Sequence, residues 1–505
     1  MHLSRRSFLK TSALGLAATA LTARSWAQVD GANHDVRIAV VGLNGRGKNH
    51  LSSLTKIPGV RLVAICDVDL LVLERTASEL AKQGLKPEKF TDIRQLLLME
   101  GLDAITIATP NHWHALAAIW ACQAGKDVYV EKPVSHNIWE GRQLVAAAKK
   151  YNRVVQAGTQ IRSGQGLIDA VAWVRAGNLG KITASRGFCY KRRDSIGKTK
   201  APTPIPATIN YDLWSGPAPI IEPHRNSKKN GPVHYDWHWI YAYGNGDVGN
   251  QGIHQMDVAR WFLGEPGLPR HTLSVGGRLG YDDDGETPNT QIVVHDYVTA
   301  PLIFEVRGLP AKKEFAVAAS DAGMNSAEAA GAAASTMDKY RGVSIGNVID
   351  CEGGSIVVPS YFEAQAYDRA GKLIKEFKGK DRLMQNFVDV IRSRKTEDLY
   401  GQIEEGHLSS ALCHVGNLSH QLGHAASPGK IADEVKADAP LAEAYGRMAE
   451  HLAANGVDVK KTRLTLGQPL AIDQKAERFT GSGSSGANKL LTRKYRAPFV
   501  VPQIA

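Results

Sequence analysis

Cysteine is scarce in this sequence of 505 residues, and its few positions follow no pattern. The five cysteines are odd in number and far apart, so neither a disulfide framework nor the paired spacing of a zinc site is visible. We therefore expect them to be buried packing residues. Long apolar runs are lacking as well, because no stretch approaches the roughly 20 apolar residues of a membrane-spanning helix.

Dense runs of one charge are also missing. The net charge is +11, but lysine and arginine are scattered, and the densest groups, 191–193 and 228–229, are short. A scattered excess of this kind is typical of a solvated surface that attracts small anions, whereas nucleic-acid binding needs a basic patch. We predict no nucleic-acid partner. The length favours two domains.

The N-terminus resembles an export signal more than a folded segment. Residues 4–10 (Ser-Arg-Arg-Ser-Phe-Leu-Lys) match a twin-arginine signal, and an apolar run of small residues, 13–23, leads to a small-x-small site at 25–27. Residues 1–27 are therefore predicted to be a signal peptide read by the twin-arginine export machinery, and the protein to be periplasmic or otherwise exported. A retained membrane anchor stays an alternative.

The rest of the chain is organised around the stretch 36–67. An apolar run, a glycine turn, a helical pattern and a second apolar run ending in Asp67 form the order of a dinucleotide-binding βαβ unit. Glycines in such a turn let the backbone approach a pyrophosphate at a helix N-terminus. The turn reads Gly42-Leu43-Asn44-Gly45-Arg46-Gly47, so Asn44 replaces the usual middle glycine and Gly45 is the alternative point of closest approach.

Asp67 is the acid that such a unit places about 20 residues after its glycines to bind the adenosine ribose. A carboxylate there repels a 2′-phosphate, so NAD is predicted and NADP is less favoured. Arg46 and Lys48 leave phosphate pairing open as the alternative.

Strand and helix patterns alternate up to residue 157. Apolar strands are expected at 104–109, 127–130 and 154–156, with helices between them. This alternation predicts an α/β fold, a Rossmann-type doubly wound parallel sheet over residues 35–157. Ligands bind at the carboxyl ends of such strands, where two polar clusters, 109–112 and 131–133, follow their strands.

Beyond residue 158 the pattern changes. An α+β domain with an open, mostly antiparallel sheet is predicted over 158–479, from strands at 181–190, 271–278, 290–299, 302–307 and 355–367. The proline-rich stretch 201–232 is expected to be a long irregular loop. The C-terminal tail, 480–505, is rich in glycine and serine and then basic, and it is expected to wrap the surface or a neighbouring subunit.

Four segments in this order resemble the Gfo/Idh/MocA (glucose-fructose oxidoreductase / inositol dehydrogenase) family of oxidoreductases, over essentially all of the mature sequence. They are the glycine loop 42–47, 108–112 (Ala-Thr-Pro-Asn-His), 131–133 (Glu-Lys-Pro) and 246–257 (Gly-Asp-Val-Gly-Asn-Gln-Gly-Ile-His-Gln-Met-Asp). The resemblance implies hydride transfer between a sugar or polyol carbon and a nicotinamide. It also implies a sheet that lines the substrate site and often forms the subunit interface, and hence a homo-oligomer.

The resemblance implies roles for individual residues. Lys132 becomes the cation that stabilises the developing alkoxide, and His254 becomes the proton carrier, for which a near-neutral pKa is suited. The family usually has an aspartate four residues before this histidine, where this chain has Asn250. Either His254 is the base alone while Asn250 binds substrate, or Asp247 takes over, or the protein does something else with its cofactor.

The remaining predicted contacts fall into three groups. Cofactor contacts are Gly42, Asn44, Gly45, Arg46, Gly47, Asp67, Thr109, Pro110, Asn111, His112, Glu131 and Lys132, with a helix cap as the alternative for Asn111. Substrate contacts are Arg192, Trp237, His238, Asp247, Asn250 and His254, with core packing as the alternative for the aromatic residues. No metal site is predicted, although His224, His234, His238 and His254 lie close enough in sequence to be weighed for zinc.

The function predicted from the sequence is that of an exported NAD(P)-dependent oxidoreductase acting on CH–OH groups of a sugar, polyol or glycoside. Since the periplasm holds little free NAD, the cofactor is expected to fold in, to stay tightly bound and to be recycled by a second substrate. The first alternative is a glycoside hydrolase that uses transient oxidation by NAD, against which Lys132 argues because such relatives commonly alter that lysine. The second is a non-catalytic sugar-binding protein, favoured by Asn250.

Overall fold

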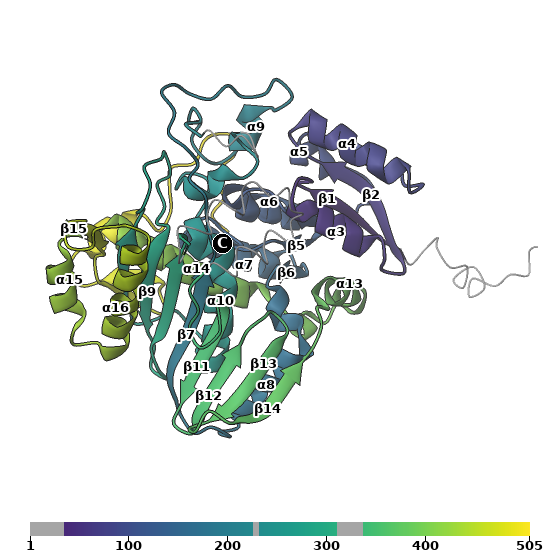
Figure 1. Cartoon of the computed structure of the whole chain (residues 1–505). Coiled ribbons are helices and arrows are strands. Elements are labelled where there is room, and N and C mark those ends of the chain that lie inside the picture. Colours follow the sequence, from purple (N-terminus) through teal and green to yellow (C-terminus); the bar gives the residue numbers. More distant parts are fainter. Residues whose placement is uncertain (1–34, 226–231, 311–336, 505) are drawn as a thin grey trace, which may run out of the picture.

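The computed structural model describes residues 35–225, 232–310 and 337–504, so the predicted signal peptide lies outside the described residues. Figure 1 shows the chain as two lobes. A purple-to-blue lobe carries the N-terminal sheet, and a teal-to-green lobe carries a larger sheet with most of the later helices.

The N-terminal lobe is a parallel sheet with the strand order β3-β2-β1-β4-β5-β6. Its strands are β1 (Val36–Val41), β2 (Val60–Cys66), β3 (Glu88–Phe90), β4 (Ala104–Ile107), β5 (Asp127–Val130) and β6 (Val155–Ala157). Its helices are α3 (Arg46–Leu54), α4 (Leu70–Ala81), α5 (Ile93–Leu96), α6 (Asn111–Gln123) and α7 (Ile138–Lys150). The predicted Rossmann-type sheet is confirmed, and β3 is a strand that the sequence pattern did not reveal.

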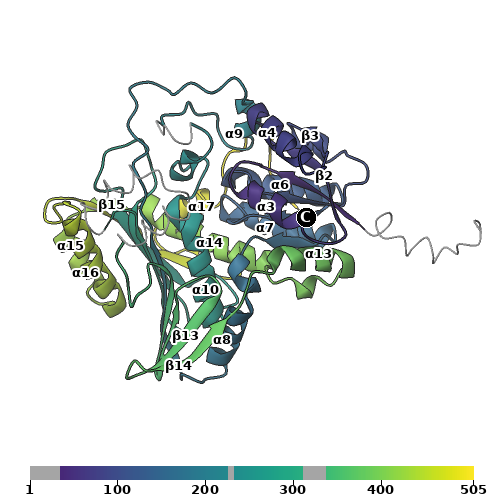
Figure 2. The same cartoon turned by 45° about the vertical axis from the view of Figure 1, so that its right-hand side comes forward.

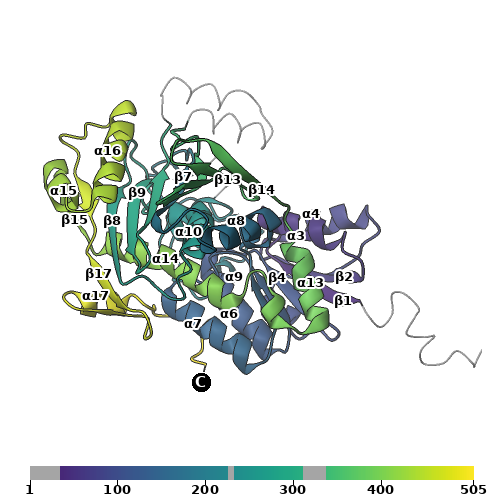
Figure 3. The ribbon, with the colours of Figure 1, turned by 90° about the horizontal axis from the view of Figure 1, so that it is seen from below.

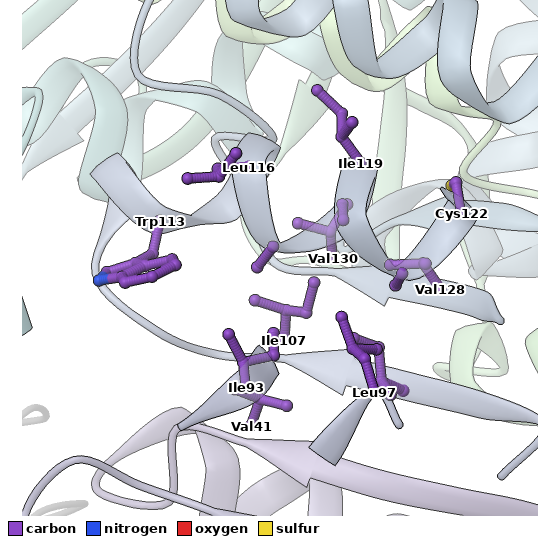
Figure 4. Packing of buried hydrophobic residues seen from close by; sticks show 14 of the residues in the cluster. Val41, Ile93, Leu97, Ile107, Trp113, Leu116, Ile119, Cys122, Val128 and Val130 are labelled. Carbon is purple, nitrogen blue, oxygen red and sulfur yellow. The ribbon is translucent and has the colours of Figure 1, made fainter. Parts of the chain in front are cut away.

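Both faces of this sheet are buried, as its nearly continuous apolar strands require. On one face, Leu116, Ile119 and Cys122 of α6 pack onto Ile107 and side chains of the neighbouring strands (Figure 4). On the other face the core is completed from far along the sequence by helix α13 (Leu383–Ser393). Figure 3 shows α13 lying beside α3 and β1. The nucleotide-binding lobe is therefore not built from the first part of the chain alone.

The second lobe is a mixed sheet of twelve strands. The order β14-β13-β12-β11-β7-β10-β9-β8-β16-β15 is extended by β17 and β18, and of the strand pairs described only β7 with β10 is parallel. The strands are β7 (Ile182–Tyr190), β8 (His271–Gly277), β9 (Thr290–Asp296), β10 (Leu302–Arg307), β11 (Ile345–Cys351), β12 (Gly354–Val358), β13 (Glu363–Asp368), β14 (Leu373–Lys378), β15 (His424–Ala426), β16 (Leu464–Leu466), β17 (Leu470–Asp473) and β18 (Arg478–Thr480). The predicted mostly antiparallel sheet is confirmed.

Helices cover both faces of this sheet. α8 (Gln165–Arg175), α10 (Ile253–Leu263) and α14 (Ile403–Gln421) lie on the face toward the N-terminal lobe, and α15 (Pro428–Val435) and α16 (Ala439–Ala454) lie on the opposite face (Figure 3). Alternation along β9 explains the two layers, because Val293 packs with α10 and α14 while Val294 packs with α15 and α16.

Two expectations need adjustment. The single strand predicted over 355–367 is a hairpin of β12 and β13, and the turn between them carries Tyr361. The predicted loop after β7 is irregular apart from the short helix α9 (Tyr211–Ser215), and it runs across the top of the molecule to α4 (Figure 2). No helix among the described residues is long and apolar enough to cross a membrane.

Candidate functional site: a nucleotide cleft between the two lobes

The glycine loop has the geometry of a close backbone approach. Gly42 is left-handed with φ of 83°, and a Cβ there would lie 2.7 Å from the carbonyl of Ala108. A Cβ on Gly47, the second residue of α3, would lie 1.9 Å from the carbonyl oxygen of Gly42. Space is open around Gly45, whose φ of 75° explains the glycine instead. Gly42 and Gly47 are thus needed where the backbone packs on itself, whereas Gly45 is needed for its backbone angle and faces open space.

Asp67 fixes this loop from the end of β2. Its carboxylate accepts hydrogen bonds from the backbone N–H of Leu43 at 2.8 Å and of Asp69 at 3.0 Å. Burial raises the pKa of Asp67, and these two hydrogen bonds oppose the rise. A carboxylate accepts up to four hydrogen bonds, so Asp67 retains acceptor capacity for the hydroxyls of a ribose.

A mostly apolar cavity opens beside Asp67. Its Rossmann side includes the glycine loop and the ends of β2 and β4, with Gly42, Asn44, Asp67, Thr109 and Pro110 among the predicted cofactor contacts. Its other side comes from the second lobe, with Ile209, Leu213, Trp214, Val233, His234 and Trp237. Because it adjoins Asp67, which the sequence predicts to bind the adenosine ribose, we call it the adenosine cavity.

Glu131 is the centre of a buried polar cluster at the other end of the cleft. Its Oε1 lies 2.8 Å from Nε of Arg46, 3.0 Å from Nε2 of His50 and 3.1 Å from Nε2 of Gln160. Burial favours the neutral carboxyl, but Arg46 and then His50 outweigh it and hold the pKa of Glu131 well below its usual range. Arg46 is therefore committed to Glu131 and is not held beside Asp67.

Lys132 is partly buried next to this cluster, and its Nζ donates a hydrogen bond to the backbone carbonyl of Asn250. Burial lowers the pKa of Lys132 to about 8; Glu131 opposes this change, while Arg46 and Lys191 add to it. A lysine with a pKa near the working pH exchanges its proton easily, which suits a group beside a reacting hydroxyl.

The segment that carries Asn250 and His254 is a π-helical turn, Val248–Gly252, leading into α10. π-helical turns are rare and frequently occur at functional sites. His254 is buried against the ring of Tyr361, at 5.1 Å between ring centroids, and its Nδ1 has no hydrogen-bond partner among the described residues. Burial, followed by repulsion from Lys132, lowers the pKa of His254 well below its usual value. This differs from the near-neutral pKa expected for His254: the ring is uncharged before substrate binds, and it accepts a proton less readily than a solvent-exposed histidine.

Asp247 does not occupy the position of a free base. Its carboxylate is buried and paired with Arg193, at 2.6 Å between Oδ1 and the guanidinium. The alternative in which Asp247 replaces the family's aspartate therefore has no support in these contacts. Arg192, a predicted substrate contact, pairs with the exposed Asp194 at 2.8 Å.

Several other predicted contacts hold the fold together. His112 has its ring between two backbone carbonyls, with Nε2 2.9 Å from that of Trp214 and Nδ1 3.3 Å from that of Tyr243, which favours a structural role. Trp237 lines the adenosine cavity instead of a sugar site. His238 stacks on Trp237 and is uncharged, because burial, with Lys132 and Arg193 nearby, lowers its pKa to about 3.

Two predicted positions retain unused polar atoms. Asn111 begins α6, and its Oδ1, like Oγ1 of Thr109, is buried without a partner among the described residues. Such atoms are expected to meet a ligand or water. The histidines weighed for zinc do not gather: His224 lies 3.0 Å from Thr199 and His234 lies 3.0 Å from Asp69.

The sequence patterns missed three side chains of the cleft. Tyr361 contacts His254 and accepts a hydrogen bond from Nε2 of Gln251 at 2.6 Å. Lys191 helps to lower the pKa of both Lys132 and His254 by electrostatic repulsion. His234 reaches Asp69 from the second lobe. Lys191 could have been noticed, because it follows directly on the expected strand 181–190. Tyr361 and His234 arrive through tertiary contacts that no local pattern reveals.

Comparison with known families agrees with this geometry. Residues 36–159 match the Gfo/Idh/MocA profile described as an oxidoreductase family with an NAD-binding Rossmann fold, and residues 168–277 match the profile of its C-terminal alpha/beta domain. The chain contains two domains of this oxidoreductase family. The fold is an NAD-binding oxidoreductase fold. The glycine loop fits that cofactor, because Gly42 and Gly47 permit the tight turn and the space beside Gly45 is open.

Curated relatives match over part of their length. A Glycosyl hydrolase family 109 protein of Shewanella pealeana is 28% identical over 204 residues, 36% of this chain and 45% of the relative. Glycosyl hydrolase family 109 protein 2 of Shewanella sp. (strain ANA-3) is 32% identical over 200 residues, 35% of this chain and 44% of the relative. The matched part thus spans less than half the length of these relatives.

Solved structures share the architecture. The WlbA dehydrogenase of Chromobacterium violaceum, crystallised with NADH and UDP-GlcNAcA, aligns with a TM-score of 0.54 and 17% identity over 78% of this chain and 95% of that chain. The WlbA dehydrogenase of Bordetella pertussis, with the same ligands, gives a TM-score of 0.51 and 18% identity over 75% and 94%. At these identities the likeness shows the fold.

Proposed function

We propose that this chain is an exported oxidoreductase that moves a hydride between a CH–OH carbon of a sugar or polyol and a resident NAD. The observation that carries the proposal is the pairing of a partly buried Lys132 with the backbone of the turn that presents His254. One group can hold the hydroxyl oxygen while the other takes its proton. Oxidation of an alcohol at a nicotinamide requires both functions.

The proton route follows from the two pKa shifts. His254 is neutral across the physiological range and receives the hydroxyl proton, and Lys132, charged below pH 8, stabilises the alkoxide as the proton leaves. NAD, when bound, accepts the hydride and returns it to a second substrate. With Asp247 tied to Arg193, Asn250 is a substrate contact and His254 is the base.

NAD over NADP is supported by charge. Asp67, Asp69 and Asp92 are acids at the adenosine end, and Arg46 is paired with Glu131. Export through the twin-arginine pathway would require this NAD to be loaded first, so the proposal includes tight binding. Homo-oligomerisation through the second sheet belongs to the same proposal and rests on the family resemblance.

A glycoside hydrolase is the second candidate, favoured by the matched relatives named Glycosyl hydrolase family 109 protein. Oxidation of a ring carbon makes the adjacent C–H acidic. Loss of that proton and of the aglycone, then addition of water and return of the hydride, gives net hydrolysis with no net redox change. The first half of this cycle uses Lys132 and His254 in the same roles.

One experiment separates the candidates. The exported protein is purified without added nucleotide, its bound cofactor is identified after denaturation, and it is then given free sugars, polyols and aryl glycosides. Reduction of bound NAD by a free sugar or polyol without release of aglycone supports the oxidoreductase, and released aglycone supports the hydrolase. Cofactor without turnover of either kind, or no cofactor, contradicts both and leaves a sugar-binding protein.

A further inference from the structure

The adenosine cavity is closed by a part of the chain that is not in the Rossmann lobe. Two stretches after β7, residues 206–216 and 233–243, supply its outer wall, and we call them together the cover. The cover has a small core of its own, in which Trp214, Trp237 and Tyr243 are buried with neighbouring apolar residues. It is therefore expected to move as a unit.

The cover is hydrogen-bonded to the N-termini of the two helices that flank the cavity. At α4, the backbone N–H of Leu70 donates to the carbonyl of Thr208 at 2.9 Å, and Nε2 of His234 lies 3.0 Å from the carboxylate of Asp69. At α6, Nε1 of Trp113 donates to the carbonyl of Trp214 at 3.0 Å. With His112, these contacts hold the cover against the Rossmann lobe beside the cavity.

The C-terminal residues 490–504, here called the strap, lie over the cover and bind it to the Rossmann lobe. The guanidinium of Arg496 donates to both the carboxylate and the backbone carbonyl of Asp212 in α9. Arg493 donates to the carbonyl of Ala242 at 2.8 Å and lies 3.5 Å from the carboxylate of Glu140 in α7. The strap thus connects both stretches of the cover with the Rossmann lobe.

Phe499 anchors the strap at the cavity wall. Its ring is buried against Trp113 and Trp120 of α6, at 5.5 and 6.4 Å between ring centroids, and Arg94 lies 5.1 Å from its centre. Trp113 is itself a wall residue of the cavity. Trp113 therefore contacts Phe499 of the strap and Trp214 of the cover, and it also lines the adenosine cavity.

We propose that the cover is part of the binding site for the adenosine half of the dinucleotide and that the strap latches it. His234, Trp214 and Trp237 are then cofactor contacts supplied by the second lobe. A bound adenine dinucleotide leaves only after the strap and the cover have separated from α6 and α4. This inference rests on the proposed NAD binding, but it does not depend on the reaction catalysed.

The test is the dissociation rate of NADH from the purified full chain, measured by the loss of bound-nucleotide fluorescence after addition of excess NAD. Arg496→Ala and Phe499→Ala are expected to raise this rate by about tenfold or more, since the first removes the hydrogen bonds to Asp212 and the second removes the ring packed on Trp113. The matched control is Lys494→Ala, which removes an exposed charge from the same strap.

Asp212→Ala provides a second variant that avoids a core change, because its side chain is 58% exposed. If Arg496 acts through α9, the effects of Arg496→Ala and Asp212→Ala on the rate combine to less than their product. Thermal unfolding identifies variants that have lost the fold. Folded strap variants that release NADH at the unaltered rate overturn the latch, even if sugar oxidation is found as proposed. A protein that binds no NAD overturns the proposed function as well.

Discussion

At the adenosine end of the cleft, the wall opposite the glycine loop is mostly apolar and aromatic and comes from the second lobe, whereas the reaction end presents buried ionisable groups. Around the adenosine cavity the polar side chains are largely paired, as His234 is with Asp69. At the reaction end Nδ1 of His254 is buried without a partner among the described residues, as Oγ1 of Thr109 is at the adenosine cavity. The difference between the two ends therefore lies in the apolar wall of the adenosine cavity and in the Lys132–His254 pair of the reaction end.

The difference has a physical cause. An apolar wall holds a ligand by burying its surface, and this contribution does not change when a hydride moves. An unpaired buried polar group costs free energy until a ligand or water satisfies it, so Nδ1 of His254 is a candidate contact for a reacting group. Substitutions at the reaction end should therefore change turnover, and substitutions at the adenosine end should change cofactor identity and residence.

The largest effect is expected for Lys132→Met, which keeps the chain length and removes the charge. Loss of the group that stabilises the alkoxide should lower kcat on the order of 10²–10³-fold. Bound NAD is quantified in parallel, so that lost chemistry is distinguished from lost cofactor. Lys126→Met is the control, because Lys126 bonds the carbonyl of Leu102 outside the cleft. Full turnover by folded Lys132→Met would remove Lys132 from the mechanism.

His254→Asn should lower kcat by roughly 10²-fold through loss of the proton acceptor. The expected signature is partial rescue by added imidazole, which a purely structural role would not give. His295→Asn is a suitable control, because His295 is another buried histidine, bonded to Thr272 within the second sheet. An unchanged kcat would show that His254 is not the base and would leave Lys132 as the candidate for that role.

At the adenosine end, Asp67→Ser should change the preference between NAD and NADP without changing kcat. Removing one carboxylate relieves the repulsion of a 2′-phosphate, so the ratio of NADP to NAD affinity should rise by about tenfold, equivalent to roughly 1.4 kcal/mol. Asp92→Ser, which alters the acid that caps α5 at the same cavity, is the comparison variant. If the ratio of NADP to NAD affinity rises equally in both variants, the selectivity depends on the total charge of the cavity and not on Asp67.

The smallest expected effect is a change of pH profile. Because burial lowers the pKa of Lys132 to about 8, the cation is present below that pH and lost above it, so kcat/KM should fall as pH rises through about 8. Asn250→Asp adds a carboxylate next to Lys132, favours the charged amine and should move this decline upward by about one pH unit. Lys132→Arg, charged throughout, should show no such decline. If kcat/KM of Asn250→Asp declines at the same pH as that of the unaltered protein, Lys132 is not the group that causes the decline.

Sequence patterns were sufficient wherever structure is local. The apolar runs at 36–41 and 104–109 contain their strands, and the glycine turn and Asp67 meet at one cavity as predicted. They were insufficient where a side chain acts at a distance. Trp237 was predicted to contact a sugar and lines the adenosine cavity, because the fold of the long loop depends on contacts with α4 and α6.

The strand predicted over 355–367 illustrates the same limit. Its apolar residues fit one extended run, but the chain turns after Val358 and begins β13 at Glu363, which brings Tyr361 against His254. The tail, expected to wrap the surface or a neighbouring subunit, wraps the Rossmann lobe of its own chain. The composition of residues 480–505 predicted that the tail wraps a surface, but it could not show which surface the tail would contact.

The packing of α13 and of Phe499 onto the first sheet has a consequence for the order of events during synthesis. A ribosome delivers roughly 5–20 residues per second, so the N-terminal strands emerge tens of seconds before the helix and the aromatic ring that complete their core. Until then both faces of the sheet lack part of their final packing and the wall of the adenosine cavity is unfinished. A binding site built on this wall is therefore complete only after residue 499 has been synthesised.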